Sequence, residues 1–150
     1  MESTPRHSVS VAAIILDDGR ANVLLIKRRD NGRWEPPGGV LEVDETLEEG
    51  LRREVFEETG LQVRVEDLSG VYKNMTRGIV ALVYRCTALS APAGETDEAS
   101  TIAWIPVGNA AKLMTPAYAV RVLDAVNDGT ASSRAHDGVH VIDERSPLVR

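Results

Sequence analysis

Residues 38–61 read GGVLEVDETLEEGLRREVFEETGL, and the second half of this stretch predicts a helix. Thr46 and Glu49 have the spacing of a capping box, in which each side chain can accept a backbone N–H at the helix start. Gly60 stands where a residue in the left-handed conformation would end the helix. Apolar residues recur between these ends at helical spacing, namely Leu47, Leu51 and Val55.

Two acidic residues of this predicted helix, Glu54 and Glu58, lie on the side that should face the protein. Glu54 and Glu58 project within roughly 40° of each other and in line with Leu47, because successive helical residues are about 100° apart. Carboxylates on an inward face repel one another and need a compensating partner. Glu57 flanks the pair, and Arg53 can orient that flank without neutralising the whole group. Mg²⁺ and Mn²⁺ prefer carboxylate oxygens, so the pattern indicates a divalent-cation site.

A charged helix can also be a solvated surface face, and that alternative applies here. Two features favour the cation site instead. The carboxylates interrupt the apolar stripe, and the turn Pro36-Pro37-Gly38-Gly39 stands shortly before the helix. Two prolines stiffen this turn, and two glycines let backbone approach a ligand closely.

The same residues resemble the complete signature of the Nudix hydrolases. The match comprises nine positions within 23 residues: Gly39, Glu45, Arg53-Glu54-Val55, Glu57-Glu58 and Gly60-Leu61. The resemblance implies an α/β fold, the Nudix-type α/β/α sandwich with a mixed β-sheet, over about residues 8–127. Asp44 stands where many members carry glycine, but this position is outside the signature.

The resemblance also implies an enzyme that hydrolyses the diphosphate linkage of a nucleoside diphosphate joined to another moiety. Its small-molecule nucleotide substrate would be a nucleoside triphosphate or an ADP-ribose-like compound. The expected cofactor is Mg²⁺ (or Mn²⁺), which would neutralise the diphosphate and activate water. Its expected ligands are the Gly38 carbonyl, Glu54, Glu57 and Glu58. Catalytic roles are expected for six residues: Glu45, Arg53, Glu54, Glu57, Glu58 and Glu98.

Arg53 would position the carboxylates with Glu45 as its partner, whereas the proton acceptor stays open among Glu57, Glu58 and Glu98. Glu98 belongs to an acidic loop where many family members supply an extra carboxylate to the metal or to the attacking water.

Three residues outside the helix are expected to contact the substrate: Arg28, Trp34 and Gly39. Arg28 belongs to the basic run 27–29, which leads toward the glycine turn and could instead be a solvated strand end. Trp34 could stack on a base or close the core under the turn.

The rest of the chain predicts strands at 8–16 and 22–29, joined as a hairpin, and at 61–65, 68–75, 78–89 and 101–105. A short helix should follow Pro106, and a last helix should span 116–127. We therefore expect a Nudix domain at 1–127. Residues 128–150 are expected to form a C-terminal tail, flexible or packed as an edge segment, in which His136 and His140 are tail histidines.

Composition fits one globular domain of 150 residues with a net charge of −6. An acidic chain offers no overall basic field, so no DNA partner is expected. Cys86 is the only cysteine, which excludes an intrachain disulfide. The apolar stretch 9–16 is too short to span a bilayer, so no membrane partner and a cytoplasmic location are expected. A homodimer is expected only by analogy with the family.

Two other functions are compatible with parts of the sequence. One is a non-catalytic nucleotide-binding or regulatory module on the same fold. The other is an RNA-binding protein that uses residues 27–29 with Trp34, which would bind without metal and with strong salt dependence. The sequence leaves open the particular nucleotide, the number of metal ions and the oligomeric state.

Overall fold

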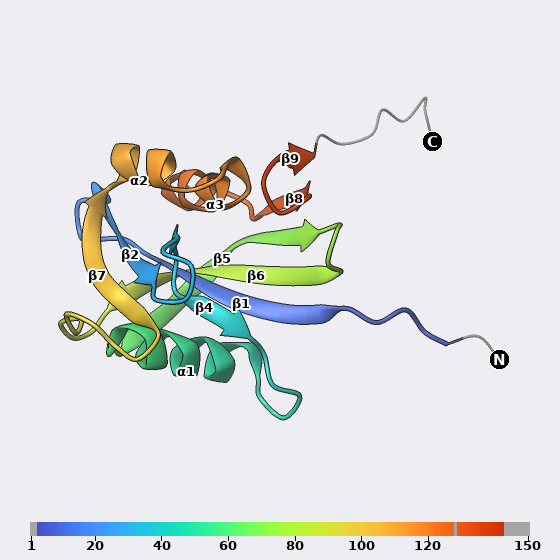
Figure 1. Ribbon diagram of the computed structural model, residues 1–150, viewed down its shortest axis with the longest axis horizontal. Helices are drawn as coiled ribbons and strands as arrows, with labels where there is room; N and C mark the ends of the chain where they lie inside the picture. Colours follow the sequence, from blue (N-terminus) through green and yellow to red (C-terminus); the bar gives the residue numbers. More distant parts are fainter. Residues whose placement is uncertain (1–2, 128, 143–150) are drawn as a thin grey trace.

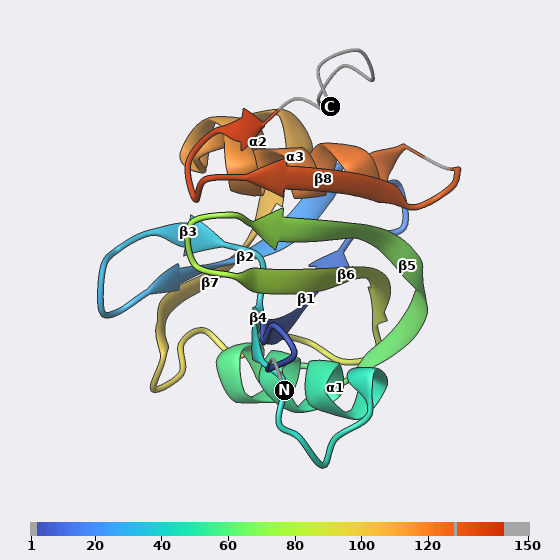
Figure 2. The ribbon, with the colours of Figure 1, turned by 90° about the vertical axis from the view of Figure 1, so that its right-hand side faces the viewer.

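The computed structural model of the chain describes residues 3–127 and 129–142. Two β-sheets form the middle layer, α1 covers one side, and α2 and α3 cover the other (Figure 1, Figure 2). Parallel and antiparallel pairings both occur, which confirms the predicted α/β/α sandwich with a mixed sheet. The elements are β1 (Ser8–Ile15), β2 (Asn22–Arg28), β3 (Trp34–Glu35), β4 (Gly38–Val40), α1 (Leu47–Thr59), β5 (Val63–Asn74), β6 (Ile79–Ala88), β7 (Ala99–Pro106), α2 (Val107–Leu113), α3 (Pro116–Val126), β8 (Ser132–His136) and β9 (Val141–Ile142).

Strand β1 is apolar on both sides because it lies between two cores. Its alternate residues Val11, Ala13 and Ile15 pack on the α1 side with Leu51 and Val55 of the helix. The intervening Ala12 and Ile14 pack on the other side, against α2 and α3. Successive strand residues point to opposite faces, so one continuous apolar run supplies both cores.

The predicted hairpin of β1 with β2 is wrong. One sheet has the order β4-β1-β6-β5-β8-β9 and the other β3-β2-β7, and the described link between β1 and β2 is a bridge from Leu16 to Val23. The Asp17 carboxylate accepts the backbone N–H groups of Ala21 and Asn22, and the Asp17 N–H donates to the Asn22 carbonyl, so these bonds close the turn between the two strands. Strand β1 pairs instead with β4 and β6, and β2 pairs with β3 and β7.

Helix α1 begins and ends where the sequence predicts. The Thr46 side chain accepts the Glu49 N–H at 3.2 Å, and Gly60 adopts φ 73° at the C-terminal end. The reciprocal bond from the Thr46 N–H to the Glu49 carboxylate is absent from the described contacts, so half of the capping box forms. The caps fix where the helix begins and ends. Packing of Leu51 and Val55 in the core sets its rotation, and this rotation decides which carboxylates face the sheet.

Residues 132–142 complete one edge of the six-stranded sheet. Strand β8 runs parallel to β5, and β9 pairs antiparallel with β8. His136 is 2% exposed, so the prediction of a tail histidine is wrong at this position, because pairing with β5 carries it under α3. Residues 143–150 of the predicted tail lie outside the described residues. Within the described part, each helix falls short of the length and apolarity needed to cross a membrane.

Candidate metal centre

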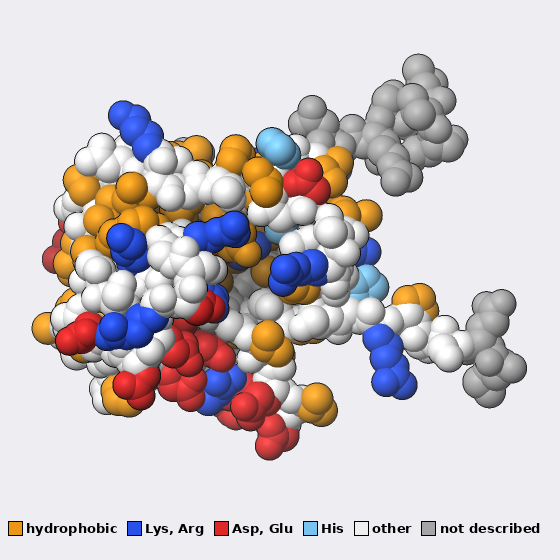
Figure 3. Space-filling view, viewed as in Figure 1, with side chains coloured by type: hydrophobic (Ala, Val, Ile, Leu, Met, Phe, Trp, Pro, Cys, Tyr) orange, Lys and Arg blue, Asp and Glu red, His pale blue; other side chains and the backbone are white. Residues whose placement is uncertain are grey.

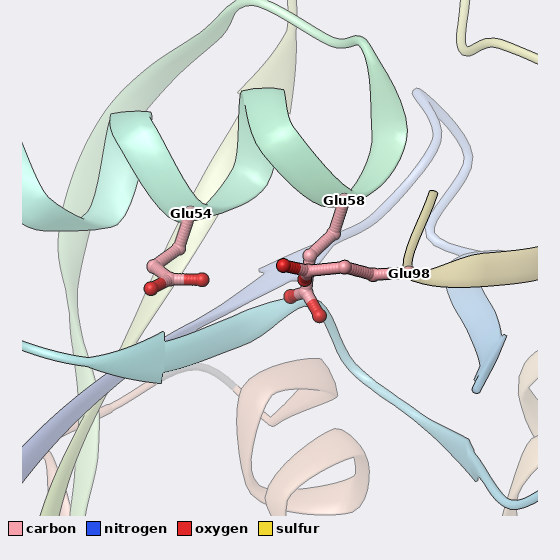
Figure 4. Close-up of side chains that lie close together, drawn as sticks. All are labelled: Glu54, Glu58 and Glu98. Atoms are coloured by element: carbon pink, nitrogen blue, oxygen red, sulfur yellow. The ribbon is translucent and has the colours of Figure 1, made fainter. Parts of the chain in front are cut away.

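Three carboxylates meet above the glycine turn. Glu54 and Glu58 project from α1, and Glu98 comes from the loop just before β7 (Figure 4). Their oxygens offer one ligand atom each within 4.8 Å of one another. Such a set of hard oxygen donors matches the ligand preference of Mg²⁺ or Mn²⁺, so the residues fit a divalent cation.

Glu58 is the most deeply buried of the three, with 4% of its surface exposed. Burial raises the pKa of Glu58 to about 8, and the nearby carboxylates Glu54 and Glu98 push the pKa in the same direction. A hydrogen bond of 2.7 Å from the Gly38 N–H opposes this effect and fixes one carboxylate oxygen. Without a cation, the fold therefore holds an acid that resists ionisation, and a bound dication would remove that penalty.

Arg53 orients the other carboxylates from the side. Its guanidinium donates two hydrogen bonds to Glu45, of 2.6 and 2.8 Å, and a third of 2.9 Å to Glu54. These bonds lower the pKa of Glu45 to about 2 and keep this residue ionised. Burial raises the pKa of Glu54 despite the Arg53 contact. Glu45 therefore lies against Arg53 and outside the cluster formed by Glu54, Glu58 and Glu98.

The two glycines of the turn serve different neighbours. A Cβ on Gly39 would lie 2.5 Å from the Glu54 carboxylate, so the absent side chain is what leaves room for this group. A Cβ on Gly38 would lie 2.3 Å from the Val11 carbonyl oxygen in β1. Gly39 therefore protects the site, whereas Gly38 allows β4 to pair closely with β1.

Glu57, a predicted metal ligand, lies apart from the cluster. Its side chain is 48% exposed and meets Arg53 at 3.4 Å. The helix turns by about 100° per residue, so Glu57 cannot share the inward direction of Glu58. The structure places Glu57 beside Glu54 through their common Arg53 partner rather than with Glu58 and Glu98.

Thr96 holds the loop that carries Glu98, a role that nothing in the sequence around it indicates. Its hydroxyl donates to the Glu58 carbonyl at 3.0 Å, and its own carbonyl accepts from Arg29 at 2.9 Å. The Arg29 N–H also donates to the Glu98 carbonyl. The loop is therefore tied both to the end of α1 and to Arg29, directly after β2, which brings Glu98 over the helix.

A cavity of about 410 Å³ opens over the three carboxylates, with Arg28 and Arg29 at its margin. Figure 3 shows acidic side chains gathered over α1 and the preceding loop, with Lys and Arg side chains above them. Arg28 is already bound by Asp30 and by Glu35 at 3.0 Å. Arg28, the predicted phosphate contact, therefore lies at the cavity, but its guanidinium is already paired with Asp30 and Glu35.

Trp34 lines a second, adjoining groove of about 770 Å³ that also has Arg28 in its wall. The same side chain packs against the core on the α2 and α3 side. Its two alternative interpretations, closing the core and facing a ligand, are therefore compatible in one position. Tyr118 of α3 lines the same groove, although nothing in the sequence around it indicates this.

Comparison with known proteins identifies the family. The NUDIX domain family matches residues 6–125. A MutT-like protein of Streptomyces ambofaciens is 50% identical over 141 residues, covering 93% of this chain and 90% of that protein. An ADP-ribose pyrophosphatase of Methanocaldococcus jannaschii is 34% identical over 113 residues, covering 71% and 66% respectively. The solved NUDIX hydrolase of Nitrosomonas europaea shares the fold, with a TM-score of 0.73, 21% identity and coverage of 89% and 82%. From its sequence, its fold and these relatives, the chain belongs to the Nudix family and is a Nudix hydrolase.

Proposed function

We propose that this enzyme hydrolyses the diphosphate linkage of a nucleoside diphosphate joined to another moiety, with Mg²⁺ or Mn²⁺ bound at the carboxylate cluster. Nudix hydrolases generally use divalent metal ions and act on small nucleotide substrates. One observation carries the proposal: Glu54, Glu58 and Glu98 offer oxygens within 4.8 Å of one another beneath an open cavity. A buried acid among like charges, as Glu58 is, indicates a site shaped for a cation.

Five residues are proposed to hold the cation or to orient its ligands. Glu54, Glu58 and Glu98 would hold the ion, and Arg53 with Glu45 would fix the direction of Glu54. A bound dication would neutralise phosphate oxygens and lower the pKa of a water molecule. The contacts of Arg53 with Glu45 and Glu54 support these proposed roles.

Glu57 and the turn complete the proposed site. Mg²⁺ keeps several water ligands in proteins, and the exposed Glu57 beside Glu54 is suited to accept hydrogen bonds from them. The Gly38 carbonyl is proposed as a further oxygen ligand because Gly38 lies in the cavity wall. Glu57, Glu58 and Glu98 stay as candidates for the proton acceptor.

The substrate would extend from the carboxylates past Arg28 into the groove with Trp34. Arg28 lines both cavities, so a substrate phosphate there would replace Asp30 or Glu35 as the partner of its guanidinium. Two relatives narrow the choice of nucleotide. The M. jannaschii relative is named an ADP-ribose pyrophosphatase, and a Bacillus subtilis protein, 38% identical over 60 residues, is named a putative 8-oxo-dGTP diphosphatase. We propose ADP-ribose and nucleoside triphosphates as the first substrates to test.

The test is a nucleotide panel assayed for phosphate, pyrophosphate and nucleoside monophosphate, with Mg²⁺, Mn²⁺ or EDTA. Glu58→Gln should lower the rate by roughly 100-fold or more, the usual effect of losing a group that acts in the transition state. Glu48→Gln is the matched control, because Glu48 lies on the same helix, is 54% exposed and meets Arg52. Equal rates in the wild type and Glu58→Gln, or turnover that ignores EDTA, would refute the proposal.

A further inference from the structure

A small cavity of about 80 Å³ lies on the other side of the sheet from the carboxylates. Residues of α3 and of strands β1, β5, β6 and β8 line it, including Arg121 and His136. Both side chains are more than nine-tenths buried, at 6% and 2% exposed. Each has a buried nitrogen without a hydrogen-bond partner, Nε of Arg121 and Nε2 of His136. Buried polar atoms are rarely left unpaired, so this cavity needs an explanation.

Arg121 packs against two aromatic rings, and no hydrogen bond joins its guanidinium to another described residue. Its guanidinium carbon lies 5.1 Å from the ring centre of Tyr72 and 4.5 Å from that of Tyr118. A cation near an aromatic ring is stabilised electrostatically, but a ring face does not replace an oxygen acceptor for its N–H groups. Among the described residues, no carboxylate lies within ion-pairing distance of Arg121.

Nearby carboxylates are occupied elsewhere. Asp124, one turn along α3, accepts from Tyr72 at 2.7 Å and from Arg134 at 2.8 Å. Glu35 acts on Arg121 only from a distance and pairs with Arg28. A buried cation without a counter-ion is costly, since truncated or missing partners leave an uncompensated charge. An anionic ligand would supply the missing counter-charge.

His136 presents a second donor to the same cavity. Its Nδ1 accepts the Gly138 N–H at 3.0 Å, so the ring proton of the neutral side chain lies on Nε2, the unpaired atom. Asn74, which also lines the cavity, adds a third donor. Its Oδ1 accepts from the backbone N–H groups of Thr76 and Arg77, so only its NH₂ group is left to bind a ligand.

We propose that this cavity binds an oxyanion group, a phosphate or a carboxylate, through Arg121, His136 and Asn74. Its volume accommodates one such group, and the Ser10 hydroxyl in the wall can donate a further hydrogen bond to it. The site goes beyond metal-dependent hydrolysis and does not depend on it. The cavity shares Asn74 and Tyr118 with the groove that begins at the metal centre. An acidic group at the far end of a substrate and a free anion would therefore use the same donors.

Inorganic phosphate is the first probe, used with the full chain in EDTA so that no turnover and no cation contribute. With a dissociation constant of about 1 mM, 20 mM phosphate should raise the melting temperature by roughly 5 °C over chloride of equal ionic strength. The gain should vanish in Arg121→Met and shrink in His136→Asn, which keeps an acceptor for Gly138 but lacks the Nε2 donor. Arg64→Met, an exposed arginine paired with Glu66, should keep the full gain.

The nitrogen NMR resonance of the His136 ring should also move with phosphate in the wild type, which makes the test independent of whether Arg121→Met folds. No melting shift in the wild type, an equal shift in all variants, or an unmoved His136 resonance would overturn the proposal. A second arm compares the binding of AMP and of adenosine 2′,5′-bisphosphate by calorimetry in EDTA, with and without phosphate, because neither contains a diphosphate linkage to hydrolyse. Tighter binding of the bisphosphate that is lost with phosphate and in Arg121→Met would assign the site to an acidic group of the substrate, and equal binding of the two nucleotides would assign it to a free anion. Neither phosphate readout requires hydrolysis, so failure of the proposed function would leave this test intact.

Discussion

Replacing Glu58 by glutamine should stabilise the metal-free protein at alkaline pH while it abolishes metal binding. The amide oxygen of the introduced glutamine could still accept the Gly38 N–H, so the change removes the charge and keeps the bond seen at 2.7 Å. The new NH₂ group would lie among Glu54 and Glu98, where a donor is favourable.

The size of the effect follows from the pKa of Glu58, raised by burial from 4.5 to about 8. Because the folded pKa lies above the unfolded one, the contribution of Glu58 is retained at low pH and lost as pH rises toward 8. A tenfold change in an equilibrium is about 1.4 kcal/mol, so folding with Glu58 costs about 4 kcal/mol at pH 8 and under about 1 kcal/mol at pH 5. In a chain of this length, that difference is roughly 10 °C in melting temperature.

Calorimetric melting in EDTA at pH 5, 6.5 and 8 measures this difference. Glu58→Gln should gain on the wild type as pH rises, whereas Glu57→Gln, at a side chain 48% exposed, should follow the wild type. Addition of 10 mM Mg²⁺ should raise the melting temperature of the wild type and leave that of Glu58→Gln unchanged. Burial of this carboxyl would carry no such cost if Glu58→Gln were less stable than the wild type at pH 8. The same conclusion would follow if the difference between their melting temperatures did not change with pH.

Three further predictions concern metal affinity, the glycine turn and the α3 side of the sheet. The apparent Mg²⁺ affinity should rise about 50-fold from pH 6 to pH 8, because Glu58 must lose its proton to bind a cation. Calorimetry in two buffers of different ionisation enthalpy measures that proton, and a pH-independent affinity would contradict the assignment. Gly39→Ala should weaken Mg²⁺ binding about tenfold with little change in melting temperature, because its Cβ would displace the Glu54 carboxylate. Gly38→Ala should instead lower the free energy of unfolding by about 3 kcal/mol, because its Cβ would force β4 away from β1. Calorimetric titration and urea unfolding separate the two, and equal losses in both variants would argue against distinct roles. Tyr72→Phe removes the buried donor to Asp124 and should cost about 1 kcal/mol in urea unfolding, and an unchanged midpoint would show that this bond adds nothing.

Much of the metal centre could be predicted because it is local in sequence. Glu54 and Glu58 are four residues apart on one capped helix, so helical geometry alone brings them together. Glu57 shows the limit of that reasoning, because it shares the family signature and yet turns toward Arg53 and solvent. The resemblance indicated Glu98, but its position over α1 depends on Thr96. The bonds of Thr96 to the end of α1 and to Arg29 after β2 join segments far apart in the chain.

Pairing partners of the strands could not be predicted in the same way. An apolar run on 8–16 shows that the strand is buried on both sides but not which strands flank it. The hairpin prediction failed because the nearest strand in sequence lies in the other sheet. His136 was misjudged for the same reason, since a polar segment after a linker-like stretch becomes buried only through long-range pairing with β5.

Strand β1 also separates the consequences of mutation. Its odd-numbered side chains support α1 and the metal centre, and its even-numbered ones support α3 and the cavity at Arg121. A substitution on one side is felt mainly by the packing on that side, since residues without shared neighbours contribute independently. Substitutions during evolution could therefore change the ligand bound on the α3 side and leave the metal centre between α1 and the sheet unchanged.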